Sequence, residues 1–328
     1  VKMGDAKVKV AVAAGVFIIG VAGGAYKLLS DWLKTETGER EMRDKYSVAV
    51  LKFETFRTQM TKANQVGTGA FGTVYRCIIP ELGNQSYFAA KVLDRSKQLK
   101  VAQEECLGNR EFFRELEVLA LCRHPNIIRT VAVSFDSELV LIYPYVNGGD
   151  LDERLGSSSP LSCMDRGSIA LQLLDAILYL HSPLVDKPCI LHRDIKPQNV
   201  LLETPPARGG RPVARLTDFG SACIYDEDRA KAENGNGFSV RFVGTRGYAD
   251  PTGVHETLDE RSDAYSLGVV ILRLLTGRPA LDAQRRPLPA ALRRELAAGG
   301  GRSYLATADP ALGRAGGDGW AADAAEAQ

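Results

Sequence analysis

The chain has 328 residues, of which 45% are hydrophobic and 25% charged, and its formal net charge is +1. This composition indicates a globular protein with a proper core, and the small net charge gives no reason to expect a nucleic-acid partner. Six cysteines are spread along the chain without a CxxC pair. That pattern favours a reducing compartment and indicates neither a disulfide framework nor a cysteine metal site.

The first feature in chain order is an uncharged stretch over residues 10–26, bracketed by Lys9 and Lys27. If Lys27 extends its ammonium group to the interface, the apolar run becomes long enough to span a bilayer. Many glycines and alanines make it only weakly hydrophobic, so a targeting segment or a surface helix is the alternative. Residues 10–29 are thus a candidate membrane anchor, and residues 31–46 are expected to be a helical or flexible linker.

A glycine-rich segment, "VGTGAFGTVY", follows at residues 66–75. Its three glycines remove side chains where a backbone must turn sharply or approach a ligand closely. The β-branched and aromatic residues after them predict strands, whereas the glycines of a dinucleotide-binding loop would open a helix. The next segment, residues 87–93, predicts a strand with Lys91 in an apolar run, and a buried lysine needs a partner.

A helix is predicted in "NREFFRELEVLALCRHPNII", because Phe112, Leu116, Leu119 and Ala120 share one face at three- and four-residue spacing. Glu111 and Glu115 lie one turn apart on a neighbouring face of this helix. Either glutamate could pair with Lys91, and the spacing alone does not decide between them.

The segment "LHRDIKPQN" at residues 191–199 places several charged and amide side chains directly before an apolar run. A solvated turn between a predicted helix at 168–182 and a strand is the ordinary interpretation. Asp194 and Asp218, however, both lie on loops beside short apolar strands, and Asn199 is close to the first of them. Oxygen ligands on such loops suit Mg²⁺, which usually shares its coordination shell with substrate phosphates.

Six motifs occur in a fixed order over about residues 60–280: "GTGAFGTV", "AAKVL", "LHRDIKPQN", "TDFG", "GTRGYADP" and "RSDAYSLGVV". Together they resemble the motifs of a eukaryotic protein kinase. Lys196, two residues after Asp194, and the "GTRGY" segment are similar to the serine/threonine type. The segments "LVLIYPYVNGGDLDERL" and "PLSCMDRGSIA" resemble the receptor-like and interleukin-receptor-associated group. The resemblance implies the α+β bilobal kinase fold, with a small β-rich N-lobe carrying one key helix and a larger, mainly helical C-lobe.

The resemblance also implies ATP and Mg²⁺ as cofactors and serine or threonine hydroxyl groups of proteins as acceptors. Asp194 would accept the proton of the attacking hydroxyl, and Lys196 would neutralise charge on the γ-phosphate. Asn199 and Asp218 would bind the metal ions. The residues expected around ATP are Val66, Gly67, Gly69, Gly72, Val74, Ala89, Lys91 with Glu115 as its partner, Val146 and Leu201.

These expectations divide the chain into four parts: a hydrophobic segment with its linker (1–45), an N-lobe (46–146), an incomplete C-lobe (147–310) and an Ala/Gly-rich tail (311–328). The kinase domain is expected on the cytoplasmic side of a membrane. A soluble cytoplasmic protein or an organelle membrane is the alternative location.

Two departures from the family pattern stand out. Thr252 occupies the position of a family glutamate, which in the family pairs with an arginine in the last helices. In addition, the apolar helix predicted at 263–275 is expected to lose part of its cover, so self-association is predicted. A pseudokinase scaffold that binds ATP and partners is therefore the alternative to an active kinase. A small-molecule phosphotransferase is a third reading, which the "GTRGYADP" segment disfavours.

Overall fold

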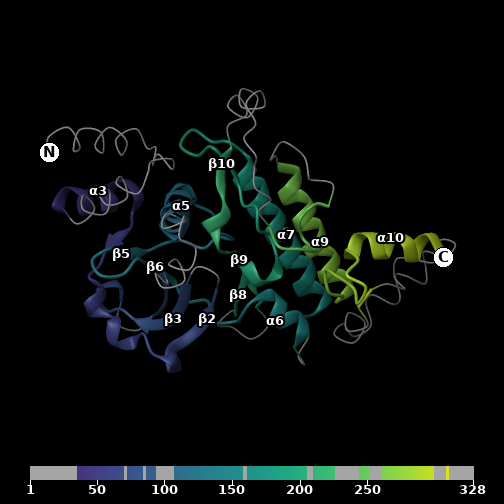
Figure 1. Cartoon of the computed structure of the whole chain (residues 1–328), viewed down its shortest axis with the longest axis horizontal. Helices are drawn as coiled ribbons and strands as arrows, with labels where there is room; N and C mark the ends of the chain where they lie inside the picture. Colours follow the sequence, from purple (N-terminus) through teal and green to yellow (C-terminus); the bar gives the residue numbers. More distant parts are fainter. Residues whose placement is uncertain are drawn as a thin grey trace. The chain divides into compact units, whose positions relative to one another are not determined.

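The computed structural model describes residues 35–69, 72–83, 86–93, 107–157, 161–204, 210–225, 244–251, 260–298 and 308–309. The chain divides into two compact units (Figure 1). The first contains the chain up to Arg123 together with residues 128–145 and 219–221, and the second contains residues 124–127, 146–218 and 222–328. The candidate membrane anchor and Thr252 lie outside the described residues. No helix in the described part of the chain has both the length and the apolar character needed to cross a bilayer.

A six-stranded sheet forms the framework of the first unit. Its strand order is β1 (Ala49–Val50), β5 (Ala132–Ser134), β6 (Val140–Pro144), β4 (Tyr87–Leu93), β3 (Gly72–Ile78) and β2 (Gln65–Thr68). Neighbouring strands are antiparallel, except that β1 runs parallel to β5. The strand predicted at 87–93 is confirmed with the same bounds. Phe56, Ile79 and Ile142 are fully buried in the core of this unit.

Helix α3 (Glu36–Tyr46) precedes the sheet, so this part of the predicted linker is helical. The Thr35 side chain caps its start by accepting a hydrogen bond from the Gly38 N–H, at 3.2 Å. Ser47 ends the helix with φ 54°, in the left-handed region. Short 3₁₀ turns lead from β1 to β2 and from β3 to β4, at η1 (Phe53–Thr55), η2 (Arg57–Gln59), η3 (Lys62–Asn64) and η4 (Pro80–Leu82).

Helix α5 (Leu107–Leu121) carries the apolar face that its sequence predicts, with Phe112, Leu116 and Leu119 all 1% exposed. The short turn η6 (Phe219–Ser221) contacts α5 although the two are far apart in the sequence. Phe219 is fully buried there. Residues 219–221 are therefore an integral part of the first unit.

The second unit is mainly helical. Its helices are α6 (Leu151–Gly156), α7 (Cys163–His181), α9 (Glu260–Thr276) and α10 (Leu288–Ala298). Its short strands form two antiparallel pairs, β7 (Cys189–Leu191) with β10 (Cys223–Tyr225), and β8 (Val200–Glu203) with β9 (Val213–Leu216); η5 (Pro197–Asn199) precedes β8. The predicted α+β architecture of one sheet-rich and one mainly helical part is confirmed.

Helix α9 is better covered than its sequence predicts. Leu267, Val269, Val270 and Leu274 are buried, and Leu275 is the only large apolar side chain of the helix that is largely exposed. Both α7 and α10 pack against α9, which explains this burial. The prediction that this helix would carry an exposed apolar patch is wrong, and the larger group of exposed apolar side chains lies on α7.

A buried ion pair ties the chain near residue 309 to the second unit. Arg166 on α7 is 2% exposed, and its Nη2 lies 2.8 Å from Asp309 Oδ2. The same guanidinium donates to the carbonyl oxygens of Leu161 and Leu274. The Asp309 N–H in turn donates to the Leu275 carbonyl, at 2.9 Å. These three partners of Arg166 are all oxygen atoms, which compensates the cost of burying its charge.

We predict that Asp309→Ala lowers the free energy of unfolding of the second unit by about 3–5 kcal/mol, because it leaves the Arg166 charge buried without its carboxylate. Urea unfolding followed by circular dichroism measures this loss. Glu295→Gln is the matched control, since it breaks the Arg278–Glu295 pair, whose side chains are 34% and 49% exposed. That exposed pair should contribute less than about 1 kcal/mol. Equal losses in the two variants would contradict the prediction.

Candidate functional site

Lys91 meets an acidic partner within the first unit. It lies on β4 between Val74 of β3 and Leu141 of β6. Its Nζ is 2.7 Å from Oε2 of Glu115 on α5, and the two side chains are 15% and 3% exposed. Of the two glutamates that helical spacing allows, Glu115 is therefore the one that pairs with Lys91.

The second oxygen of the same carboxylate is held as well. The Tyr143 hydroxyl on β6 donates to Glu115 Oε1 at 2.7 Å, and Tyr143 is 7% exposed. The sequence analysis did not predict this bond, because the two residues are 28 positions apart and on different kinds of element. With both oxygens engaged, the Glu115 carboxylate has a defined orientation toward Lys91.

The predicted glycine hairpin is formed by β2 and β3. Gly72 must be glycine, because a Cβ there would lie 2.2 Å from the Val92 carbonyl oxygen. The Gly69 N–H donates to the Gly72 carbonyl at 2.9 Å, and the strand register shifts between Gln65 and Gly67. The other predicted nucleotide-binding residues of this unit are Val66, which is exposed, and Val74 and Ala89, which are half-buried on β3 and β4.

Asp194 is the centre of a hydrogen-bond cluster in the second unit. Its Oδ1 accepts from the Thr245 hydroxyl at 2.6 Å. Its Oδ2 accepts from Lys196 Nζ at 2.6 Å and from Asn199 Nδ2 at 3.2 Å. Lys196 Nζ also donates to Thr245 Oγ1, at 2.9 Å. Three side chains from two separate segments therefore fix the orientation of the Asp194 carboxylate.

The cluster leaves this carboxylate able to accept another proton donor. An ionised carboxylate has about four lone-pair sites, and three donors bind Asp194 here. The remaining capacity suits the hydroxyl group of an acceptor substrate.

The backbone that leads into Asp194 is held by Asp263, a fully buried residue of α9. The carboxylate of Asp263 accepts from the backbone N–H groups of His192 at 2.7 Å and Arg193 at 2.8 Å, and from the His181 ring at 3.0 Å. Burial alone would raise the pKa of Asp263, but the His181 hydrogen bond, the nearby His192 and the two backbone donors outweigh it, so its pKa lies below the usual range. Asp263 therefore stays ionised near neutral pH.

Asn199 and Asp218 are brought together at one end of the β8–β9 hairpin. The Asn199 carbonyl accepts from the Thr217 N–H at 2.9 Å and from its hydroxyl at 3.1 Å, so Asp218 follows directly after a residue bonded to Asn199. Asn199 Nδ2 donates to the Asp194 backbone oxygen at 2.8 Å. Asp218 has φ 63°, a left-handed conformation that a non-glycine residue adopts only when its surroundings impose it.

This donor set fits a hard cation that keeps part of its shell for another ligand. An amide oxygen and a carboxylate are the ligands that Mg²⁺ takes in phosphate-transfer sites. Within the described part of the chain, no group of three or more His, Cys, Asp or Glu side chains could hold a metal ion by itself. Phosphate oxygens would have to complete the coordination, as the sequence analysis expects.

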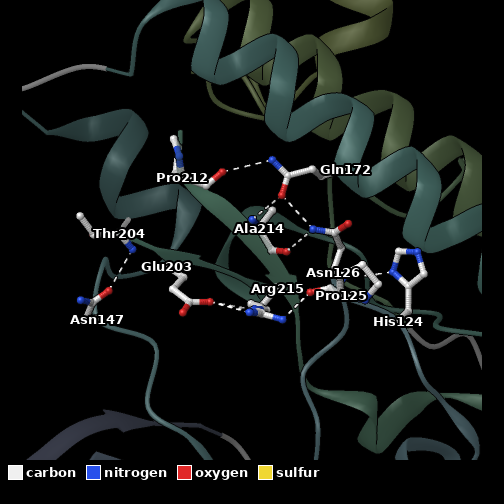
Figure 2. Close-up of polar contacts among 10 residues, drawn as sticks. All are labelled: His124, Pro125, Asn126, Asn147, Gln172, Glu203, Thr204, Pro212, Ala214 and Arg215. Atoms are coloured by element: carbon white, nitrogen blue, oxygen red, sulfur yellow. Dashed lines mark hydrogen bonds and ion pairs between the residues drawn. The ribbon is translucent and has the colours of Figure 1, made fainter. Parts of the chain in front are cut away.

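The β8–β9 hairpin is itself anchored by a polar network around residues 124–126 (Figure 2). Asn126 Nδ2 donates to Gln172 Oε1 at 2.8 Å and to the Ala214 carbonyl at 2.9 Å. Arg215 pairs with Glu203 across the hairpin and donates to the Pro125 carbonyl. The network fixes the hairpin, and Asn199 and Asp218 lie together at its open end.

Two predicted residues of the second unit remain. Val146 is buried, and Leu201 of β8 forms an isolated antiparallel β-bridge with Asp150. The predicted set thus divides between the units, with Asp194, Lys196, Asn199, Asp218, Val146 and Leu201 in the second and the others in the first. The family resemblance marks Thr245 as a structural or substrate-facing residue, but its bond to Asp194 was not predicted, and the sequence analysis missed His181 and Asp263 as parts of the site. Two features of the sequence could have drawn attention to these residues. Thr245 is a hydroxyl residue in "GTRGY", and Asp263 is an aspartate in a largely apolar helix.

Comparison with known proteins agrees with this geometry. The family model "Protein kinase domain" matches residues 60–295. A probable receptor-like protein kinase of Arabidopsis thaliana is 34% identical over 242 residues, 70% of this chain and 35% of the relative. An EPD1-interacting receptor-like cytoplasmic serine/threonine-protein kinase of Gossypium barbadense is also 34% identical, over 69% of this chain and 46% of the relative.

Wall-associated receptor kinase-like 20 of Arabidopsis thaliana is 30% identical over 85% of this chain and 42% of the relative. The chain therefore spans less than half the length of these curated relatives. Because the family model covers most of the chain, and because relatives of the receptor-like group match the same region, the chain belongs to the eukaryotic protein kinase family, within its receptor-like serine/threonine group.

Proposed function

We propose that the chain transfers the γ-phosphate of ATP to serine and threonine hydroxyl groups of protein substrates. The observation that carries this proposal is the Asp194 carboxylate, oriented by Lys196, Asn199 and Thr245 and still able to accept a substrate hydroxyl. Phosphoryl transfer needs mainly positioning and charge stabilisation, because there is little covalent chemistry for the protein to perform.

The proposal gives each residue the role that the family resemblance implies. Lys91, held by Glu115, binds the α- and β-phosphates under the hairpin glycines Gly67, Gly69 and Gly72, while Val66, Val74, Ala89, Val146 and Leu201 contact the adenine. Asn199 and Asp218 would hold Mg²⁺, which when bound offsets the negative charge of the phosphates. Asp194 takes the proton of the attacking hydroxyl, and Lys196 offsets charge on the transferred group.

The test compares Asp194→Asn with Asp186→Asn, a change at an exposed aspartate outside the cluster. Asp194→Asn should retain ATP binding but lower turnover by about two to four orders of magnitude, the usual contribution of a positioned acid–base group. Asp186→Asn should leave both unchanged. Transfer of labelled phosphate from Mg-ATP to a basic protein measures turnover, and calorimetry measures ATP binding.

Full activity in Asp194→Asn would contradict the assignment of the base. Wild-type protein that binds ATP but transfers no phosphate would instead support the alternative of a pseudokinase scaffold.

We also propose that residues 10–29 attach the chain to a membrane, with the kinase domain on the ATP-containing cytoplasmic side. The support is the uncharged apolar run of the sequence, flanked by Lys9 and by Lys27 near its end. After cell fractionation, the protein should stay with membranes through a carbonate wash, and deletion of residues 1–30 should release it with its activity intact. Full-length protein in the soluble fraction would refute the anchor and leave a soluble cytoplasmic kinase.

A further inference from the structure

Helix α7 presents four large apolar side chains to solvent. Met164 is 61% exposed, Leu171 69%, Leu174 42% and Leu178 57%. The opposite side of the helix is buried, through Arg166, Ile169, Leu173, Ala176, Ile177 and Leu180. Contiguous exposed apolar side chains of this size mark an interaction surface more often than scattered single residues do. The four residues are called the α7 stripe below.

The rotation of α7 about its axis is fixed, so the stripe has a defined direction. Gln172, which follows Leu171, points from α7 toward Asn126 and Ala214 (Figure 2). Its amide oxygen accepts from the side chain of the first and the backbone N–H of the second, both at 2.8 Å. Its amide nitrogen donates to the Pro212 carbonyl at 3.1 Å. These bonds hold one face of α7 inward and leave the α7 stripe outward.

The spacing of the α7 stripe is that of a helix-pairing seam. Met164, Leu171 and Leu178 recur every seven residues, and Leu174 takes the second apolar position of the heptad. The equivalent position one heptad earlier is Gly167, which is exposed and has open space around the place of a Cβ. The stripe therefore combines three projecting leucines with one hollow.

Charge does not oppose the pairing of two such faces. Asp175 borders the stripe and is exposed, but its carboxylate is engaged by His124 Nε2 at 3.1 Å. The His124 ring is in turn stacked on Tyr179, with centroids 5.0 Å apart. The acidic group is thus turned toward its own unit, which limits repulsion between like faces.

We propose that the α7 stripe binds the same stripe of a second copy of this chain, with the two α7 helices antiparallel about a twofold axis. In this register Leu171 lies opposite the partner's Leu174, and the hollow at Gly167 receives the partner's Leu178. A twofold interface requires a face to complement itself. The hollow at Gly167 and the side chain of Leu178 meet that requirement, because each faces the other on the partner copy.

The size of the face sets the strength of the dimer. The four side chains expose on the order of 400 Å² per copy, about half of the ~800 Å² per partner of a standard stable interface. The dimer should therefore be weak and concentration-dependent, with a dissociation constant in the micromolar range. The proposal concerns assembly alone and does not depend on the proposed phosphotransfer.

Sedimentation velocity of the full chain over a range of micromolar concentrations tests the proposal. The wild type should pass from monomer to dimer, and Leu171→Glu should weaken the dimer at least ~10-fold, because it places a charge at the centre of the seam. Ile224→Glu is the matched control, an exposed aliphatic residue of the same unit on β10, and it should dimerise as the wild type does.

Gly167→Leu separates the proposed register from other ways of covering the stripe. The space around Gly167 is open within one copy, and leucine is the better helix former, so the monomer should be at least as stable in a thermal melt. The added side chain would fill the hollow for the partner's Leu178, so dimerisation should weaken. A wild type that stays monomeric, a Leu171→Glu dimer of unchanged strength, undefined aggregates, or tighter association of Gly167→Leu would each overturn the proposal.

Discussion

The buried carboxylate of Asp263 is the interaction on which the backbone geometry around Asp194 depends. Placing a charge in the interior is unfavourable unless hydrogen bonds replace its hydration, and here three donors from α7 and from the chain after β7 do so. Two of them are the backbone N–H groups directly before Asp194. Arg193 has φ 72°, which costs of order 1–3 kcal/mol for a non-glycine residue. The charge-assisted bond from its N–H to Asp263 offsets that cost.

The same principle recurs at three other charged side chains in the described part of the chain, each held by more than one hydrogen-bond partner. Glu115 receives a lysine on one oxygen and a tyrosine hydroxyl on the other. Asp194 receives a lysine, a threonine and an asparagine. Arg166 pairs with the Asp309 carboxylate and donates hydrogen bonds to two carbonyl groups. Each of these groups is oriented by its partners, so the chemistry of the site and the stability of each unit rest on the same contacts.

Local patterns predicted the elements well, because each is encoded within a few consecutive residues. The apolar run around Lys91 gave the bounds of β4, and the glycines of residues 66–75 indicated the hairpin. The start of α7 was placed too late, although Ser162 and Asp165 form a readable capping box. The parallel pairing of β1 with β5 had no local signal, since it joins segments about 80 residues apart.

Contacts between distant segments set the limit of prediction for the site. Spacing allowed Glu111 or Glu115 for Lys91, the family resemblance pointed to Glu115, and the structure places Glu115 against Lys91. Thr245 reaches Asp194 from 51 positions away, and Asp309 reaches Arg166 from the far end of the described chain. The spacing of apolar residues along the sequence does not indicate contacts between residues so far apart. The family resemblance supplied roles for single residues and the pairing of Lys91 with Glu115, but not the partners that orient Asp194 or the second oxygen of Glu115.

The central claim is that Asp263 holds the chain around Asp194 in shape, and hydrogen–deuterium exchange of Asp263→Asn tests it most directly. Losing bonds to a charged group, each contributing about 1.5–3 kcal/mol, should speed amide exchange in the peptide covering residues 189–194 by about 100-fold or more. Peptides from α7 and α10 should change little, and His181→Gln, which keeps a side-chain donor for Asp263, should resemble the wild type. Unchanged protection at residues 189–194 in Asp263→Asn would contradict the account.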